Sequence, residues 1–274
     1  MIEFFSLPFI KYAFIAGLLA SISFGVIGTW IVIRRISYLT GAIAHSVLAG
    51  IGVSLFLRSR YNLPNLNPLF GALAAGILAA VIIGIVSIKT KEREDTIIGA
   101  IWAIGMSVGL LFIAKTPGYV DPMSYLFGNI LIISRGDLVL IAVLDAIILI
   151  LGLLFYAPYQ TIAFDEEFAR IRGINTNLFN MMLLIMTAVT VVLMTTIIGI
   201  VMVIALLTIP AAIAGLLSKR IWVIMVLAVI ITAVFTMSGL VVSYLTDLPS
   251  GSVIIAISGV TYLAAILAAK LFKH

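Results

Sequence analysis

Long apolar stretches recur along this chain from one end to the other. A helix needs roughly 20 apolar residues to cross the ~30 Å hydrocarbon core of a bilayer. Because lipid offers no hydrogen-bond partners, such stretches cross it as helices, which pair their backbone groups internally. We therefore expect an all-α, polytopic membrane helical bundle with about eight or nine transmembrane helices. The expected spans are 9–33, 40–57, 68–88, 96–114, 136–156, 179–197, 199–217, 221–245 and 251–270.

The composition excludes an ordinary soluble protein. Hydrophobic residues make up 64% of the 274 residues and charged residues only 10%, whereas soluble domains carry about 25% charged residues. No polar segment is long enough for a second domain, so we expect a single transmembrane domain over residues 1–274. The net charge of +5 would suit nucleic acid, but the basic residues lie between the spans, which is typical of membrane topology. The absence of cysteine excludes disulfides and thiolate metal sites.

Two apolar segments differ in length from a single span. Residues 179–217 would form a helix of ~58 Å, nearly twice the thickness of the bilayer. We expect this segment to divide near Thr195–Gly199, with Pro210 as a kink in the second part. Pro122–Ile133 is too short to cross and is expected to be re-entrant or interfacial. The first span follows Lys11 without a clear cleavage site, and we interpret it as a retained helix rather than a signal peptide.

The basic residues divide unequally between the two sides of the predicted bundle. Eleven of the sixteen fall on one side, and the positive-inside rule places that side in the cytoplasm. With an odd number of spans, the N-terminus lies outside and the C-terminus inside. The cytoplasmic set is Arg34, Arg35, Lys89, Lys91, Arg93, Arg170, Arg172, Lys219, Arg220, Lys270 and Lys273, and the opposite set is Lys11, Arg58, Arg60, Lys115 and Arg135.

The longest polar interruption is AFDEEFARIRGINTN, residues 163–177. Asp165 and Glu166 open it and arginines follow, an order that complements the dipole of a short helix ending at Gly173. The apolar residues of one face are Phe164, Phe168 and Ile171. We expect this amphipathic helix to lie on the cytoplasmic side and to dock onto a partner protein. The alternative is a solvated connector that touches nothing.

The only internal histidine, His45, lies in the apolar stretch ISYLTGAIAHSVLAGIG. Gly41, His45, Ala49 and Gly52 fall on one helical face, and small residues allow helix backbones to approach closely. A second stripe of this kind is the GxxxG segment Gly105–Gly109. An ionisable group at membrane depth is costly, which favours a lined pathway where the imidazole binds a metal ion. The alternative is a histidine that only packs and bonds a carbonyl of a neighbouring helix.

Two aspartates are further pathway candidates. Asp145 is the other charge inside a predicted span. It would neutralise a basic group, line a cavity, or bond a serine or threonine of a neighbouring helix, and we favour structural pairing. Asp247, in TDLPSG, belongs either to a tight outer turn whose chemistry explains it or to an outer mouth that attracts cations.

Six motifs in a fixed order resemble the permease subunits of the bacterial ABC importers for zinc, manganese and iron. They are RRISYLTGAIAHSVLAGIG, EREDTIIGAIWAIGMSVGLLF, MSYLFGNILIISRGDL, AFDEEFARIRGIN, IGIVMVIALLTIPAAIAGLLS and SYLTDLPSG, which together cover nearly the whole chain. The resemblance implies a homodimeric ABC importer permease in the bacterial inner membrane, with a cytoplasmic coupling helix. Two cytoplasmic ATPase subunits would drive it, and an extracytoplasmic binding protein would deliver the metal.

The resemblance also implies roles for individual residues. The segment 163–173 matches the coupling helix that docks into the ATPase, and Arg58 and Arg60 on the outer side would meet acidic patches of the binding protein. The positions assigned to ATPase coupling are Asp165, Glu166, Ala169 and Gly173. The chain has no GxxxxGK[ST] loop, so a partner subunit hydrolyses ATP. The substrate would be a divalent metal ion, and no cofactor is bound permanently.

One position departs from the pattern of that family. Many relatives carry an aspartate one turn before the histidine, where this chain has Gly41. The metal site is therefore incomplete in one chain, and the histidine of a second copy together with water would supply further ligands to join His45. Because Mn²⁺ prefers oxygen ligands, the missing carboxylate favours zinc over manganese.

Other functions are less well supported. An intramembrane enzyme is disfavoured because His45 and Ser46 point about 100° apart on a helix. The sequence also lacks HExxH and any glycine-framed nucleophilic serine. A passive channel is also disfavoured, because a docking segment would have no purpose in it. Importers of cobalamin, siderophores or haem share the broader architecture and are the main alternative, which metal-uptake assays distinguish.

Overall fold

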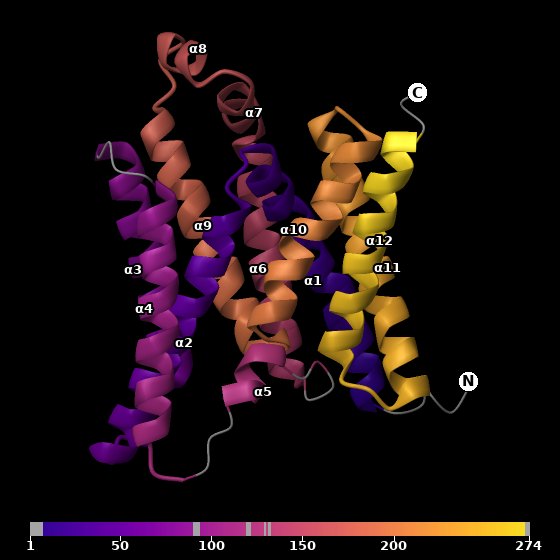
Figure 1. Cartoon of the computed structure of the whole chain (residues 1–274). Helices are drawn as coiled ribbons and strands as arrows, with labels where there is room; N and C mark the ends of the chain where they lie inside the picture. The colour runs from indigo at the N-terminus through magenta and orange to yellow at the C-terminus, as the bar shows by residue number, and fades with distance from the viewer. Residues whose placement is uncertain (1–7, 90–93, 119–121, 129, 131–132, 272–274) are drawn as a thin grey trace.

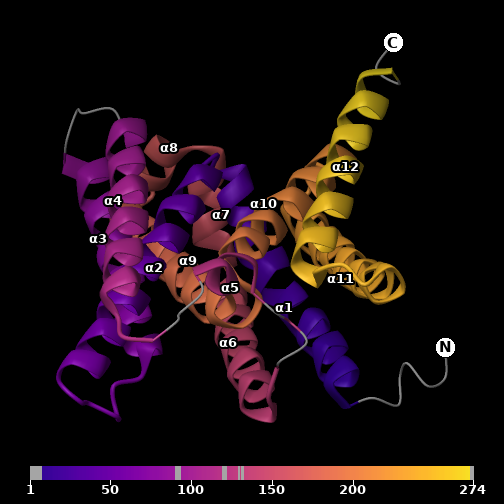
Figure 2. The same ribbon diagram turned by 60° about the horizontal axis from the view of Figure 1, so that its bottom comes forward.

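The fold consists of helices joined by short connections (Figure 1 and Figure 2). The computed structural model describes residues 8–89, 94–118, 122–128, 130 and 133–271. This part of the chain contains twelve helices and no strand, so the all-α prediction is confirmed. The helices are α1 (Pro8–Ile33), α2 (Ser37–Arg60), α3 (Pro68–Lys89), α4 (Glu94–Lys115), α5 (Pro122–Phe127), α6 (Arg135–Leu154), α7 (Tyr156–Phe164), α8 (Glu166–Ile171), α9 (Thr176–Ile198), α10 (Ile200–Leu217), α11 (Ile221–Thr246) and α12 (Ser250–Leu271).

Nine of the described helices are long and apolar enough to cross a membrane. They are α1, α2, α3, α4, α6, α9, α10, α11 and α12. Each predicted span corresponds to one of them, although the ends differ. Helix α2 continues to Arg60, so Arg58 and Arg60 lie in its last turn and not in the loop that the sequence suggested. Helix α1 begins and α12 ends at opposite ends of the bundle (Figure 1), as an odd number of spans requires.

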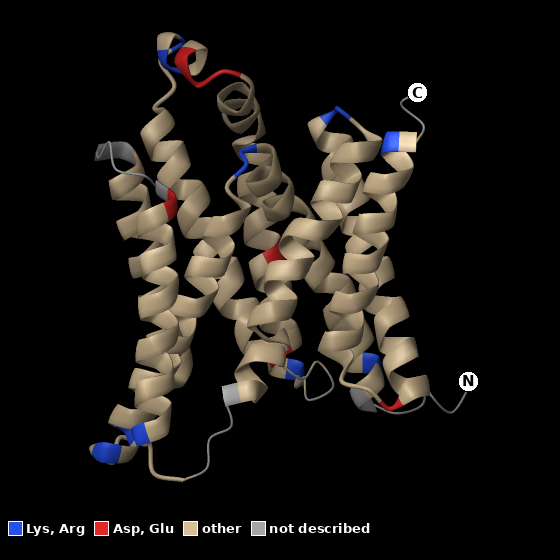
Figure 3. Cartoon of the chain, in the orientation of Figure 1, with Lys and Arg blue, Asp and Glu red and all other residues tan. Residues whose placement is uncertain are grey.

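Lysine and arginine gather at the two ends of the bundle (Figure 3). The short helix α8 and the C-terminal end of α12 lie at the same end (Figure 1). The connections at this end carry the larger basic set, so the positive-inside rule places it in the cytoplasm. Three members of that set, Lys91, Arg93 and Lys273, lie outside the described residues.

The long apolar segment divides where the sequence predicted. Helix α9 ends at Ile198, α10 begins at Ile200, and Gly199 alone joins them. Gly199 has φ of 90° and ψ of 157°, a combination essentially restricted to glycine. A Cβ atom there would lie 2.3 Å from the backbone nitrogen of Gly128, which follows α5. The short helix α5 therefore packs against this break and, at six residues, does not cross the membrane.

Helix α2 lies between α3 and α4 and also contacts α9. A Cβ atom on Gly52 would lie 2.5 Å from the carbonyl oxygen of Gly109 in α4, and one on Gly105 would lie 2.8 Å from the backbone of α2. On the other side, a Cβ atom on Gly50 would lie 2.0 Å from the carbonyl oxygen of Gly71 in α3. The predicted stripes of small residues are therefore helix contacts, and they bury α2 along most of its length.

Helix α7 was not predicted from the sequence. It follows a break at Phe155, and its proline, Pro158, lies in the first turn, where proline is tolerated. Tyr159 packs its ring 5.4 Å from that of Trp30 on α1 and 5.5 Å from that of Phe179 on α9, measured between centroids. This aromatic cluster fixes α7, and with it the start of α8, against two membrane-spanning helices.

Candidate functional site

The candidate site centres on His45 of α2, which is 8% exposed. Its Nδ1 atom lies 2.8 Å from the carbonyl oxygen of Gly41, one turn earlier. A carbonyl oxygen only accepts hydrogen bonds, so the neutral imidazole donates from Nδ1 and keeps its lone pair on Nε2. Metal-binding histidines are commonly held in this way. The backbone of α2 therefore presents Nε2 as the atom that is able to bind a cation.

The indole of Trp102, on α4, covers one face of this imidazole. The two ring centroids are 4.6 Å apart and the ring planes are inclined by 28°. The indole fits because Gly41 has no side chain: a Cβ atom there would lie 2.3 Å from the six-membered ring. Trp102 is 37% exposed and His45 only 8%, so the indole separates part of the imidazole from the surface of the chain.

One chain does not contain a complete metal site within the residues that the structure describes. No group of three His, Cys, Asp or Glu side chains there is able to hold a metal ion. Within the described residues, His45 therefore does not belong to a group of three such side chains. Ala49, the next pathway candidate on α2, is partly exposed one turn further along.

Asp145 lies on α6 and is 3% exposed. Its Oδ1 atom accepts a hydrogen bond from the hydroxyl of Ser23 on α1, while Oδ2 has no partner in the described part of the chain. Three roles for Asp145 were considered from the sequence. Of these, the structure shows the hydrogen bond to a serine of a neighbouring helix. This contact joins α1 to α6, whereas His45 packs on α4.

Three further candidates lie at the end of the bundle opposite α8. Arg58 and Arg60 are exposed in the last turn of α2, where cations complement the helix dipole. Asp247 ends α11 in the left-handed conformation, with φ of 55°, which aspartate tolerates. The hydroxyl of Ser243 donates to the carbonyl oxygen of Leu248 at 2.6 Å and closes the same turn. Turn geometry therefore accounts for Asp247.

The cytoplasmic helix α8 is capped at both ends. At its start, the carboxylate of Asp165 accepts from the backbone N–H of Phe168 at 3.0 Å. At its end, Gly173 has φ of 82°, and its N–H donates to the carbonyl oxygen of Arg170. The N–H of Ile174 donates to the carbonyl oxygen of Ala169. These two bonds form a Schellman motif. The predicted helix start and the stop at Gly173 are both confirmed.

Glu166 is bonded by two arginines. Its carboxylate lies 3.2 Å from Arg34 and 2.8 Å from Arg170. Partial burial opposes ionisation of Glu166, but the hydrogen bond from Arg170 and the charge of Arg34 outweigh it and hold the pKa of this carboxyl below its ordinary value. The acidic start of α8 is therefore a fixed anion rather than a freely solvated one.

Arg34 connects four helices at this end of the bundle. From the end of α1 it donates to the carbonyl oxygen of Ile162 in α7 at 3.0 Å and to the side chain of Asn180 in α9 at 2.8 Å, besides Glu166 in α8. Arg170 extends the network to the hydroxyl of Thr176 at 2.9 Å. The sequence had assigned Arg34 to membrane topology only, because its partners lie far along the chain.

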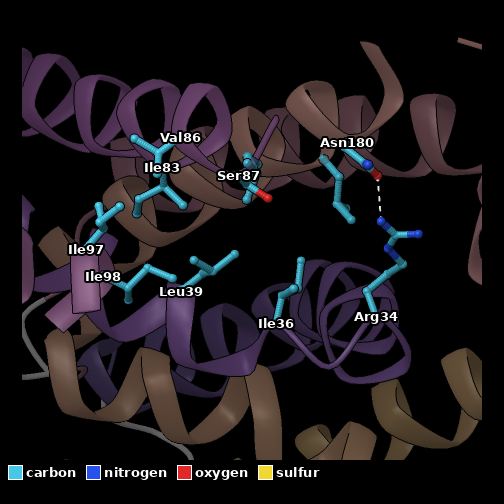
Figure 4. Close-up of a pocket in the computed structure, with 11 residues that line it drawn as sticks. Arg34, Ile36, Leu39, Ile83, Val86, Ser87, Ile97, Ile98 and Asn180 are labelled. Carbon is cyan, nitrogen blue, oxygen red and sulfur yellow. Dashed lines mark hydrogen bonds between the residues drawn. The ribbon is translucent and has the colours of Figure 1, made fainter. Parts of the chain in front are cut away.

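Two cavities adjoin this network. A polar one of about 480 Å³ lies between the turn after α1, the end of α3, α8 and α9. A smaller one of about 70 Å³ is shown in Figure 4, where Arg34 and Asn180 close one end and mostly aliphatic side chains of α2, α3, α4 and α9 line the rest. The bonds of Arg34 and Glu166 therefore link α8 to the membrane-spanning helices next to two cavities that side chains do not fill.

The apolar face of α8 points away from the bundle. Phe168 and Ile171 of this face are 45% and 85% exposed. Phe164, which the sequence placed on the same helical face, is 73% exposed but is the last residue of α7, because the extended backbone of Asp165 separates the two helices. Ala169, in contrast, is fully buried beneath the helix. Exposed apolar side chains of this size are typical of protein interfaces.

A model of the ABC 3 transport family matches residues 6–269. This chain belongs to the ABC 3 transport family. With nine helices suited to span a bilayer in its described part, it is a multi-pass cell-membrane protein and a transport component, not an enzyme.

Relatives of this family member carry names that concern metals. A "Probable metal transport system membrane protein" of Chlamydia trachomatis is 36% identical, covering 95% of this chain and 89% of the relative. The "Manganese transport system membrane protein MntC" of Listeria monocytogenes is 32% identical, covering 94% and 90%. Among solved structures, PsaBC from Streptococcus pneumoniae in complex with Fab matches with a TM-score of 0.84 and 27% identity, covering 97% of this chain and 95% of that chain.

The bonds of Glu166 predict that Arg34→Gln and Glu166→Gln loosen α8 in this ABC 3 protein. Because charge-assisted, partly exposed bonds would be lost, amide hydrogen exchange in α8 and in the end of α7 should accelerate by about tenfold. Arg172→Gln is the matched control, since the structure shows that arginine lying 5.0 Å over the Phe168 ring and not in the Glu166 pairs. Equal exchange in all three variants would contradict the role of the network.

Because the pKa of Glu166 is lowered, the effect of Glu166→Gln on amide exchange should depend on pH. A carboxyl whose pKa is lowered by folding contributes stability above its unfolded pKa, and this contribution is lost as the pH falls through the folded value. The difference in exchange between the parent protein and Glu166→Gln should therefore be full at pH 7 and shrink below about pH 4.5.

Proposed function

We propose that this chain is the membrane-spanning permease subunit of an ATP-driven importer of divalent transition metal ions. Two copies would enclose the pathway, cytoplasmic ATPase subunits would drive it, and an extracytoplasmic binding protein would supply the ion. The observation that carries the proposal is the imidazole of His45, buried in the central helix α2 with Nδ1 bonded to a carbonyl. The metal-transport names of the relatives support the same substrate class.

Zinc is the favoured ion, with manganese and iron as alternatives. A neutral imidazole is a good ligand for Zn²⁺, and Gly41 provides none of the oxygen ligands that Mn²⁺ prefers. Two copies of His45 related by a twofold axis, together with water, would form a loose site. Loose binding suits transport because the ion must leave again.

Helix α8 supplies the connection to the ATPase in this proposal. Its exposed Phe168 and Ile171, together with Phe164 at the end of α7, would dock into the partner. The bonds of Glu166 would pass the resulting movement to α1 and α9. At the opposite end of the bundle, the exposed Arg58 and Arg60 of each copy would meet acidic patches of the binding protein.

His45→Ala should reduce metal uptake by at least about tenfold, because the imidazole supplies the one nitrogen ligand of each copy. Uptake is measured in proteoliposomes that contain the ATPase and binding protein, with assembly checked by size-exclusion chromatography. Ser46→Ala is the control, since this neighbouring hydroxyl bonds only within α2. Uptake and ion preference that match the parent protein would remove His45 from the pathway.

Ile171→Glu should weaken association with the ATPase by at least about tenfold, because it places a charge in an apolar contact. Pull-down of the ATPase from detergent provides the measurement. Leu248→Glu is the matched control: Leu248 is 55% exposed, but at the opposite end of the bundle. An ATPase that binds both variants equally would exclude α8 as the docking surface.

Arg58→Glu together with Arg60→Glu should weaken capture of the binding protein, and more strongly at low salt than at high salt, because exposed charges act through screened attraction. Surface plasmon resonance on the assembled permease measures the affinity. Lys115→Glu, an exposed cation at the same end on α4, is the control. The docking proposal fails if the double reversal binds as tightly as the control.

A further inference from the structure

The pairing of Trp102 with Gly41 has a role beyond packing. We propose that Trp102 is a specificity-determining residue that restricts the number of ligands a metal ion gathers around His45. The indole takes the place beside Gly41 where a further ligand would otherwise stand. This inference rests on the proposed function, since it concerns the ion that His45 binds.

The stacking geometry leaves one approach to the imidazole open. A metal ion binds a histidine in the plane of its ring, along the Nε2 lone pair, because Nδ1 already donates to Gly41. The indole lies over the ring face at 4.6 Å and not in that plane. Trp102 therefore does not lie across the in-plane bond to Nε2, and it occupies the space in which a side chain at position 41 would stand.

This crowding discriminates between metals by coordination number. Zn²⁺ is stable with four ligands in a tetrahedron, whereas Mn²⁺ favours six oxygen-rich ligands in an octahedron. With the indole in the place of a side chain at position 41, that position supplies no ligand to the larger shell. With Trp102 in place, the four-coordinate ion is favoured.

Gly41 and Trp102 depend on each other. A Cβ atom at position 41 would lie 2.3, 2.6 and 3.1 Å from three atoms of the indole, and a planar ring has no flexible end that moves away cheaply. A carboxylate at position 41 would lie one turn before His45 and within reach of the same ion, but only after the indole has left. The two substitutions should therefore be strongly non-additive.

The test compares four proteins: the parent, Trp102→Ala, Gly41→Asp, and the double variant. Uptake from an equimolar mixture of Zn²⁺ and Mn²⁺ is measured in the assembled importer, together with thermal stability. Trp102→Ala should raise the Mn²⁺ to Zn²⁺ ratio by at least about fivefold. Gly41→Asp alone should lower the melting temperature, and the double variant should recover stability and favour Mn²⁺ further. Trp102→Phe, which keeps an aromatic cover, should fall between the parent and Trp102→Ala.

A second readout does not depend on transport. The chain has three tryptophans, so Trp30→Phe with Trp222→Phe leaves Trp102 as the sole fluorophore. Paramagnetic Mn²⁺ or Co²⁺ should quench this emission, and His45→Ala should abolish the quenching. A protein that retains only Trp222, which lies on α11, should respond to neither ion and serves as the control.

The outcomes separate this inference from the proposed function. If Trp102→Ala lowers stability but leaves the ion ratio unchanged, the indole only packs and the inference is wrong. Additive effects of Gly41→Asp and Trp102→Ala would contradict it as well. If uptake survives in His45→Ala, the proposed pathway itself is wrong, whatever the tryptophan variants do.

Discussion

Contact between helix backbones at glycine is the constraint on which this structure depends. Lipid tails are as apolar as leucine, so helices gain little by hiding apolar side chains from lipid and associate instead through close packing. At Gly50 and Gly52 the backbone of α2 meets carbonyl oxygens of α3 and α4 with no space for a Cβ atom. This packing encloses α2 and buries His45 with it. The absence of a side chain at Gly41 likewise leaves space for the Trp102 indole.

Features that depend on local sequence were predictable. The apolar runs gave the nine spans, because span length is set by the thickness of the bilayer. The break at Gly199 followed from a segment that was too long, and the stop at Gly173 followed from the order of charges before a glycine. The turn at Asp247 was likewise foreseen from TDLPSG. In each case the physical cause lies within a few residues of its effect.

Features that depend on distant residues were not predictable in this way. The bonds of Arg34 join residues more than a hundred positions apart, and nothing near Arg34 in the sequence marks Glu166 or Asn180 as partners. The stacking of Trp102 on His45 needs the register between α2 and α4, which periodicity does not fix. Burial of Ala169 depends on how α8 packs against the rest of the chain, so the sequence motif identified the residue but not the side that it faces.

The single residue between α9 and α10 limits how such a protein changes shape. Gly199 leaves no slack in the connection, and the backbone of Gly128 blocks its free side. A connection of one residue keeps the two helix ends that it joins next to each other. Because α9 also bonds Arg34 and Arg170 through Asn180 and Thr176, this one helix reaches from the contacts of α8 at one end of the bundle to the break at Gly199 at the other.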